Sequence, residues 1–293
     1  MENLAGIKFS KGHGAGNDFV FIEDVNAEID LSKDEIAYLC DRHRGIGADG
    51  LIKAVKAKAE VDADWFMDYY NGDGTVAEMC GNGARAYAKF LEHVGLFTPE
   101  KNKPFNIDTR AGLKQVIKIE DDIYSVDLGP WKLAHDNEAN EGGIDSMVKI
   151  EGIEEPRGAL SIDMGNPHTV VAVQSLAELK AANLTVMPDV QPIPKNGTNV
   201  ELITADGHVM DEGHGKISMR VFERGVGETL ACGTGIGAAA AATRFWIGED
   251  APHLWEVHVP GGVLNVEFIK DDKGNECTIL MGPAIIVSDG TLV

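Results

Sequence analysis

The sequence predicts an internally duplicated α+β protein with two similar domains, each a mostly antiparallel sheet wrapped around one central helix. Three observations lead to this prediction: the run Cys80-Gly81-Asn82-Gly83 recurs as Cys232-Gly233-Thr234-Gly235, each run opens an alanine-rich stretch, and alternating or β-branched runs flank both. If the two halves face each other, the two thiols meet across one cleft. The active site is therefore expected in the cleft between the domains.

The duplication keeps its register along the chain. A shift of 152 positions aligns the two cysteine runs and also Met67 with Met219, and a shift of 149 positions aligns Gly16-Asn17 with Gly165-Asn166. One half therefore resembles a diverged copy of the other.

The domain boundaries follow from this register. The N-terminal domain is predicted over residues 1–131 and is joined by the last strand, 284–293, whereas the C-terminal domain covers residues 132–283. The segment 131–157 contains many acidic and glycine residues, so we expect it to act as a hinge between the halves.

Secondary-structure signals support this organisation. Ser32 followed by Glu35 is a capping box, which predicts a helix through about Asp41. The alanine-rich stretches 84–93 and 236–247 predict one central helix in each half. Strands are predicted where β-branched or alternating residues cluster, at 115–119, 124–128, 169–173, 257–259 and 263–268.

The charge balance excludes several classes of partner. The 293 residues include 26 Lys and Arg against 47 Asp and Glu, a formal net charge of −21, so the field of the protein repels phosphate backbones and anionic lipids. No apolar stretch reaches the length of a bilayer span, and the N-terminus lacks the features of a signal peptide. We expect a cytoplasmic protein with no nucleic-acid partner and no membrane partner.

The four cysteines fall into two kinds. Cys40 and Cys277 lie in apolar runs and are interpreted as small core residues that remain thiols. Cys80 and Cys232 are each followed by Gly-x-Gly at the start of a predicted helix. Helix N-termini bind carboxylates and lower the pKa of a thiol, so one cysteine can act as the base while the other, as a neutral thiol, acts as the acid. A cofactor-free racemase or epimerase needs such a pair.

Other interpretations of the cysteines remain open. A single Cys-Gly-x-Gly run is also typical of a buried cysteine at a tight turn, and two such cysteines can form a regulatory disulfide with no catalytic role.

Two patterns that suggest a cofactor are rejected. The run 45–50 matches the dinucleotide fingerprint, but a helix precedes it and a strand follows, so we interpret it as a glycine-rich turn. His208, Asp211 and His214 have metal-like spacing, but they lie in the polar segment 205–215, which is interpreted as a solvated hairpin loop. Neither a cofactor nor a metal is expected.

Longer motifs resemble the diaminopimelate epimerase family and span nearly the whole chain in order. They are the runs from Asn71 to Arg85 and from Glu223 to Gly235, Gly16-Asn17-Asp18-Phe19, Gly165-Asn166-Pro167-His168 and Gly197-Thr198-Asn199-Val200-Glu201. The resemblance implies interconversion of LL-diaminopimelate and meso-diaminopimelate, in lysine and peptidoglycan precursor biosynthesis, by a pyridoxal-independent mechanism with two bases.

The resemblance also implies roles for individual residues. Cys80 and Cys232 would be the acid/base pair, and His168 with Glu223 would tune the pKa values of the thiols. Without the resemblance, an asparagine beside a glycine is typical of a turn. The substrate-binding residues that the family implies are Asn17, Asn71, Gly81, Asn82, Asn166, Asn199, Glu223, Arg224, Gly233 and Thr234.

One departure and several alternatives accompany the resemblance. Family members commonly carry Gln where Gly50 stands, and glycine there is expected to leave a gap that water fills.

Proline racemases and hydroxyproline epimerases share the expected fold and both cysteines, but typically have His where Asn82 stands. Outside this class, a noncatalytic amino-acid-binding protein and a thiol redox switch are the alternatives. The family further implies a small-molecule substrate and a homodimer.

Overall fold

The computed structural model describes residues 4–205, 210–211 and 213–293. Contacts between residues divide the chain into two compact units. Unit 1 comprises Met1–Asp127 with Gly282–Val293, and unit 2 comprises Leu128–Met281. The strands β7 (Ile123–Pro130) and β19 (Glu276–Pro283) each contribute residues to both units.

Unit 1 is a mixed sheet around one helix, with the first and last strands of the chain side by side. Along the sheet, β1 pairs with β2, β3 with β4, β5 with β6 and β6 with β7 in antiparallel fashion, whereas β2 with β3 and β4 with β5 are parallel. The C-terminal strand β20 pairs antiparallel with β1. The remaining strands of unit 1 are β1 (Lys8–Gly14), β2 (Asn17–Glu23), β3 (Gly50–Lys56), β4 (Trp65–Asn71), β5 (Pro104–Asp108), β6 (Lys114–Glu120) and β20 (Ile285–Thr291).

Unit 2 repeats this order of pairings, which confirms the predicted internal duplication. The pairs β10–β11, β13–β15, β17–β18 and β18–β19 are antiparallel, and β11–β13 and β15–β17 are parallel. Its strands are β10 (Arg157–Asp163), β11 (Pro167–Ala172), β13 (Asn199–Thr204), β15 (His214–Glu223), β17 (Leu254–Val259), β18 (Gly262–Lys270), β19, and the short β8 (Lys132–Leu133), β9 (Ser146–Lys149), β12 (Asp189–Gln191), β14 (Met210–Asp211) and β16 (Gly227–Thr229). All five strands predicted from the sequence are present.

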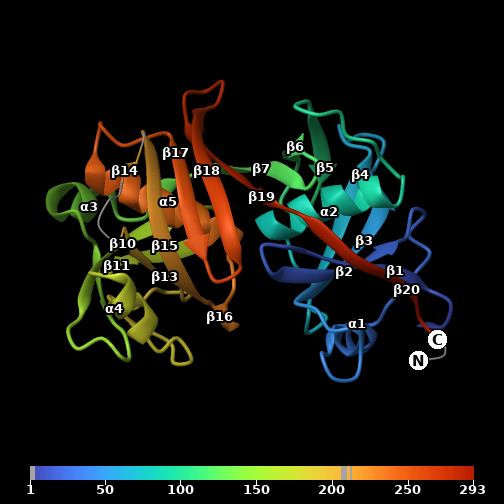
Figure 1. The fold of residues 1–293 in the computed structure, drawn as a ribbon, viewed down its shortest axis with the longest axis horizontal. Helices are drawn as coiled ribbons and strands as arrows, with labels where there is room; N and C mark the ends of the chain where they lie inside the picture. The colour runs from blue at the N-terminus through green and yellow to red at the C-terminus, as the bar shows by residue number, and fades with distance from the viewer. Residues whose placement is uncertain (1–3, 206–209, 212) are drawn as a thin grey trace. The chain divides into compact units, whose positions relative to one another are not determined.

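One central helix lies within the strands of each unit, α2 (Gly81–His93) in unit 1 and α5 (Gly233–Ile247) in unit 2 (Figure 1). The helix α2 packs against β1, β2 and β20, and α5 packs against β10, β11 and β13. Glycine and alanine are frequent at the buried positions of both helices, so the strands approach the helix backbones closely there. Both helices begin three residues before the predicted starts at 84 and 236, because Cys80 and Cys232 are themselves the N-caps.

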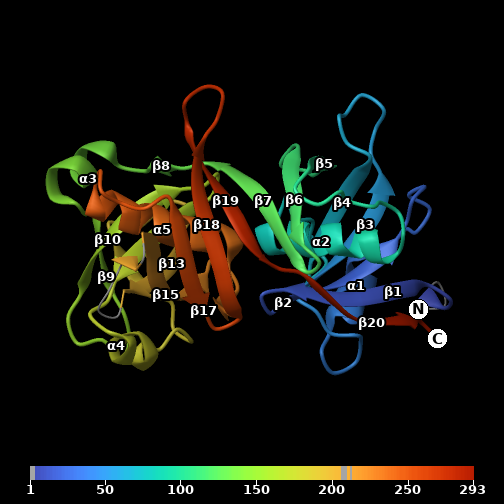
Figure 2. The ribbon, with the colours of Figure 1, turned by 45° about the horizontal axis from the view of Figure 1, so that its top comes forward.

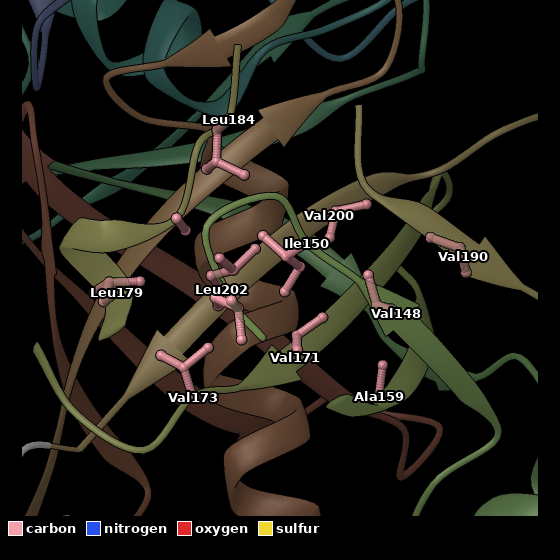
Figure 3. Packing of buried hydrophobic residues seen from close by; sticks show 12 residues of the cluster. Val148, Ile150, Ala159, Val171, Val173, Leu179, Leu184, Val190, Val200 and Leu202 are labelled. Atoms are coloured by element: carbon pink, nitrogen blue, oxygen red, sulfur yellow. The ribbon is translucent and has the colours of Figure 1, made fainter. Parts of the chain in front are cut away.

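A smaller helix covers the other face of the sheet in each unit. The helix α1 (Lys33–Cys40) begins at the predicted capping box, with Ser32 accepting from the backbone of Glu35. It packs on β2 and β3 through a cluster that includes Cys40. In unit 2, α4 (Leu176–Ala181) contributes Leu179 to a cluster with residues of β9, β11 and β13 (Figure 3). The central strands are therefore covered on both faces.

The predicted hinge at 131–157 is wrong. This segment forms β8, the helix α3 (Asp136–Gly142) and β9, and all of them belong to unit 2 (Figure 2). Val148 and Ile150 are buried in the same cluster as Leu179. Most of the acidic and glycine residues lie on the exposed surface of α3 and in the turn after β9, while these apolar residues anchor the segment to the core.

Candidate active site

In unit 1, Cys80 stands at the positive end of the central helix. It is the N-cap of α2, with an extended backbone at φ −139° and ψ 125°. The backbone N–H of Gly83 donates to Cys80 Sγ at 3.5 Å. The thiol therefore occupies the position in which the helix dipole and a backbone N–H donor both favour negative charge.

A chain of polar contacts fixes the other side of Cys80. Its thiol donates to Asn17 Oδ1 at 3.4 Å, and Asn17 Nδ2 donates to the carboxylate of Asp49 at 2.8 Å. Arg42 in turn pairs with Asp49 at 2.7 Å. Asp49 lies in the 45–50 turn, which is a turn between α1 and β3 as predicted. This role of Asp49 could not be predicted from the sequence, because Asp49 meets Asn17 only in the fold.

The other predicted residues of unit 1 differ in exposure. Asn71 is exposed at the end of β4, and its Nδ2 donates to Thr75 Oγ1 at 3.0 Å. Asn82 is fully buried in the first turn of α2, where its Oδ1 accepts from Arg85 at 2.9 Å. Gly14 packs so closely on the Asn82 carbonyl that a Cβ there would lie 2.7 Å from it. The first turn of α2 is thus held rigidly against β1.

In unit 2, Cys232 occupies the corresponding N-cap of α5, with φ −113° and ψ 115°. Its Sγ lies 3.7 Å from the hydroxyl of Thr234. Asn166 Nδ2 donates to the same hydroxyl at 3.3 Å. Asn17 directly follows the β1–β2 turn and Asn166 lies in the β10–β11 turn, and each contacts the cysteine motif of its own unit.

Behind these groups lies the buried pair of His168 and Glu201. A role was predicted for His168 but not for Glu201. His168 Nδ1 donates to Glu201 Oε1 at 2.7 Å, and His168 Nε2 lies 3.1 Å from Asn166 Oδ1. Glu201 is completely buried on β13, and its second oxygen has no hydrogen-bond partner. A charged residue inside the apolar run 199–204 was the available signal, because a buried carboxylate is costly unless a partner holds it.

The charge around Cys232 differs from the sequence expectation. Burial raises the pKa of the Cys232 thiol well above its usual range, and the carboxylates of Glu223 and Glu201 raise it further. Burial also raises the pKa of Glu223, whose Oε1 accepts from Thr229. The expectation that both helix ends lower the thiol pKa toward neutrality is therefore wrong for Cys232, since burial and two carboxylates outweigh the helix N-terminus.

Asn199 and Arg224 form one assembly at the end of β15. Asn199 Oδ1 accepts from the backbone N–H of Arg224 at 2.9 Å, and Asn199 Nδ2 donates to the Pro167 carbonyl at 3.1 Å. The exposed guanidinium of Arg224 donates to the carbonyl of Asn196 at 2.9 Å. In the part of the chain that the structure describes, no carboxylate pairs with Arg224. Its charge is available to an anionic ligand.

The space beside Gly50 is filled by the protein itself. A Cβ on Gly50 would lie 2.6 Å from the Tyr70 carbonyl oxygen and 2.7 Å from the Tyr69 ring. The water-filled gap expected at this position is therefore wrong, because Tyr69 occupies the room that a longer side chain would need.

The described residues contain no group of three or more His, Cys, Asp and Glu side chains arranged to hold a metal ion. Of the predicted loop residues with metal-like spacing, His208 and the side chain of Asp211 lie outside the described residues, while His214 begins β15. Cys40 and Cys277, interpreted as core residues, are buried thiols.

Comparisons with known proteins agree with this architecture. The profile of a family described as diaminopimelate epimerase matches residues 9–134 and 160–287. A diaminopimelate epimerase of Rhodococcus jostii (strain RHA1) is 41% identical over 300 residues, which cover 97% of this chain and 96% of the relative. No helix among the described residues is both long enough and apolar enough to cross a bilayer.

Two solved structures share the fold at low identity. A phenazine biosynthesis protein of the PhzF family from Bacillus anthracis aligns with a TM-score of 0.68 and 17% identity, covering 98% of this chain and 99% of the other. A probable proline racemase from Agrobacterium radiobacter K84 aligns with a TM-score of 0.67 and 13% identity, covering 98% and 93%.

The duplicated α+β fold, with a cysteine at the start of each central helix, and the named relatives together define an isomerase. The family profile and the relative at 41% identity show which family of isomerases this is. This chain belongs to the diaminopimelate epimerase family.

Proposed function

We propose that this protein interconverts LL-diaminopimelate and meso-diaminopimelate without a cofactor, using Cys80 and Cys232 as its two acid/base groups. The observation that carries the proposal is that each of two duplicated units places one cysteine as the N-cap of its central helix. The relative from Rhodococcus jostii is named for this substrate.

The reaction requires one proton to leave and one to arrive. In the forward direction a cysteine thiolate takes the α-proton, so the Cα–H bond breaks and an S–H bond forms. The electron pair of the broken bond spreads into the α-carboxylate. The other cysteine gives its S–H proton to the opposite face of the same carbon, which restores a Cα–H bond with inverted configuration. Thiolate and thiol have then exchanged places.

The carbanion must be stabilised electrostatically, because no cofactor accepts its electrons in this scheme. The backbone N–H groups of Gly81, Asn82, Gly233 and Thr234 belong to the first turns of α2 and α5. We assign them to the reacting carboxylate, since backbone N–H groups at a helix start and the helix dipole stabilise it more strongly as negative charge accumulates.

The remaining predicted residues suit a substrate with a second charged head. Arg224 presents an exposed guanidinium without a carboxylate partner among the described residues, which fits the distal carboxylate. Glu223 and the amides of Asn17, Asn71, Asn166 and Asn199 provide acceptors for ammonium groups. His168, held by Glu201, is assigned to tuning the thiols.

The cellular setting is part of the proposal. We propose a cytoplasmic homodimer that acts in lysine and peptidoglycan precursor biosynthesis, with domains at 1–131 together with 284–293 and at 132–283. Support comes from the family to which the chain belongs. Analytical ultracentrifugation of the purified protein tests the homodimer, which predicts a mass of twice 31.4 kDa.

Incubation with LL-diaminopimelate in deuterated water tests the function. Proton NMR should show deuterium entering an α-position while meso-diaminopimelate appears by chiral chromatography. The double variant Cys80→Ala/Cys232→Ala is the matched control and should produce neither signal. Absence of both signals in the wild-type protein would refute the proposed function.

A further inference from the structure

Arg85 is a completely buried arginine on α2. Its Nη1 donates to the Gly81 carbonyl at 3.2 Å and its Nη2 donates to Asn82 Oδ1 at 2.9 Å, while its Nε has no hydrogen-bond partner. Among the described residues, no carboxylate pairs with this guanidinium. A buried charge with only neutral acceptors is costly, so its presence calls for an explanation beyond folding.

The guanidinium reaches back to the first turn of the helix, whose N-cap is Cys80. Side chains on a helix point back toward its N-terminus, and both acceptors of Arg85 are within two residues of Cys80. Burial lowers the pKa of Arg85 to about 10, and the charge of Cys80 is what opposes that change. Arg85 therefore remains a cation at neutral pH, and its electrostatic partner is the thiol.

Unit 2 has the opposite arrangement at the matching place. The shift of 152 positions that aligns the cysteines aligns Arg85 with Gly237, where a Cβ would already lie 3.0 Å from the methyl group of Met164. The charges near Cys232 are the carboxylates of Glu201 and Glu223. The duplicated frame thus carries a cation beside one cysteine and anions beside the other.

Several charged groups on the strands that pack against α2 already have partners of opposite charge. On β1 and β2, Lys11 and Asp18 pair with each other, and Asp18 also binds Arg42. On β20 and β6, Asp289 binds His93 and Lys118 binds Glu92, both on the later turns of α2. On β3, Lys53 pairs with Asp24 and Asp68. His13 on β1 accepts from the backbone of Gly16.

We propose that Arg85 is a positioning residue of the reaction, a fixed buried cation that stabilises the thiolate of Cys80. The inference rests on the proposed function in taking Cys80 as a proton carrier. Asn17 has the opposite effect on Cys80. Its Oδ1 accepts a hydrogen bond from the Cys80 thiol and so favours the neutral form of the thiol. Arg85 and the helix N-terminus balance Asn17, which keeps Cys80 able to lose and regain a proton.

The test is the pH dependence of iodoacetamide alkylation of Cys80, measured in a Cys232→Ser background. Cys40 and Cys277 are buried, and burial raises the pKa of Cys40 to about 12, so they do not compete. Arg85→Met should raise the midpoint by about 1 pH unit or more, the usual effect of removing an adjacent opposite charge. Arg85→Lys keeps the charge and should stay near the parent midpoint.

A matched control removes an arginine elsewhere. Arg244→Met makes the same change on α5, where the guanidinium pairs with Glu276, and should leave the Cys80 midpoint unchanged. If Arg85→Met does not fold by circular dichroism, Arg85→Gln replaces it as the neutral variant.

Two results would overturn the inference. One is a folded neutral variant with the parent midpoint. The other is an equal rise in Arg85→Lys, which would assign the effect to the hydrogen bonds rather than to the charge. Alkylation needs no substrate, so either outcome is distinguishable from failure of the proposed epimerisation.

Discussion

His168 donates to Glu201 across 2.7 Å, and neither side chain is exposed to solvent. From His168 the contacts continue through Asn166 to the hydroxyl of Thr234, which lies 3.7 Å from the sulfur of Cys232. Glu201 therefore sets the orientation of a histidine that in turn orients the groups around the thiol. Because the pair is fully buried, water cannot take the place of either partner.

Replacing Glu201 by Gln should lower kcat roughly ten- to a hundredfold, the range expected when groups near the reacting atoms lose their orientation. Glu256→Gln is the matched control, because Glu256 binds His258 in a half-exposed pair on β17, and its kcat should stay near the wild-type value. Steady-state assays of both variants check this. Equal kcat in Glu201→Gln and wild type would show that the buried pair serves stability alone.

Replacing either Cys80 or Cys232 by Ala should abolish epimerisation, because each face of the α-carbon needs its own proton carrier. Cys277→Ala is the control, since Cys277 is a buried thiol outside the candidate site, and it should remain active. Far-UV circular dichroism should be unchanged in all three. Near-native turnover of Cys80→Ala or Cys232→Ala would contradict the two-base assignment.

Glu223→Gln should lower the pKa of Cys232. Burial and the carboxylates of Glu223 and Glu201 raise this pKa, and a negative charge disfavours a neighbouring thiolate, so removing it must move the titration to lower pH. In a Cys80→Ala background, the midpoint of Cys232 alkylation should fall by about 1 pH unit. Glu228→Gln, at an exposed carboxylate that binds Arg220, should not move it. An upward shift in Glu223→Gln would exclude the electrostatic account.

Gly50→Gln should destabilise the protein, although it restores the residue common in the family. The new Cβ would lie 2.6 Å from the Tyr70 carbonyl, which is backbone and cannot move cheaply. Overpacking of this kind costs about 1–3 kcal/mol. Urea denaturation should show that loss, while Gly142→Gln, at a position with open space around it, should change the free energy of unfolding by less than about 0.5 kcal/mol.

The repeat and its central helices could be predicted because their signals are local. A cysteine before Gly-x-Gly and an alanine-rich stretch mark α2 and α5, and strand patterns recur at nearly constant offsets. The hinge prediction at 131–157 failed because most of the acidic and glycine residues of this segment are exposed, whereas Val148 and Ile150 are buried and determine where the segment packs.

The residues that the sequence did not reveal act through neighbours distant in the chain. Asp49 binds Asn17 from 32 positions away, and Glu201 binds His168 from 33 positions away. The pKa of Cys232 likewise depends on burial and on two carboxylates, Glu201 on β13 and Glu223 on β15. A helix start indicates a favourable dipole, but only the fold determines whether desolvation outweighs it.

Substrate choice tests the assignment of Arg224 to the distal carboxylate. Its backbone N–H is held by Asn199, and its side chain lies over Gly197, where a Cβ would come within 3.1 Å of Arg224 Cδ. An arginine held in this way can bind a carboxylate through two hydrogen bonds. Lysine and proline lack that carboxylate and would leave the charge unpaired.

Wild-type protein in deuterated water should therefore incorporate deuterium into LL-diaminopimelate far faster than into lysine or proline. A lost charge-assisted hydrogen bond costs about 1.5–3 kcal/mol, or roughly ten- to a hundredfold in kcat/KM. Arg224→Met should lose at least that factor with diaminopimelate and gain nothing with proline. Arg44→Met, at an exposed arginine that binds Asp41, should behave as wild type. Should wild-type protein exchange proline as fast as diaminopimelate, the pocket assignment falls and a proline racemase activity takes its place.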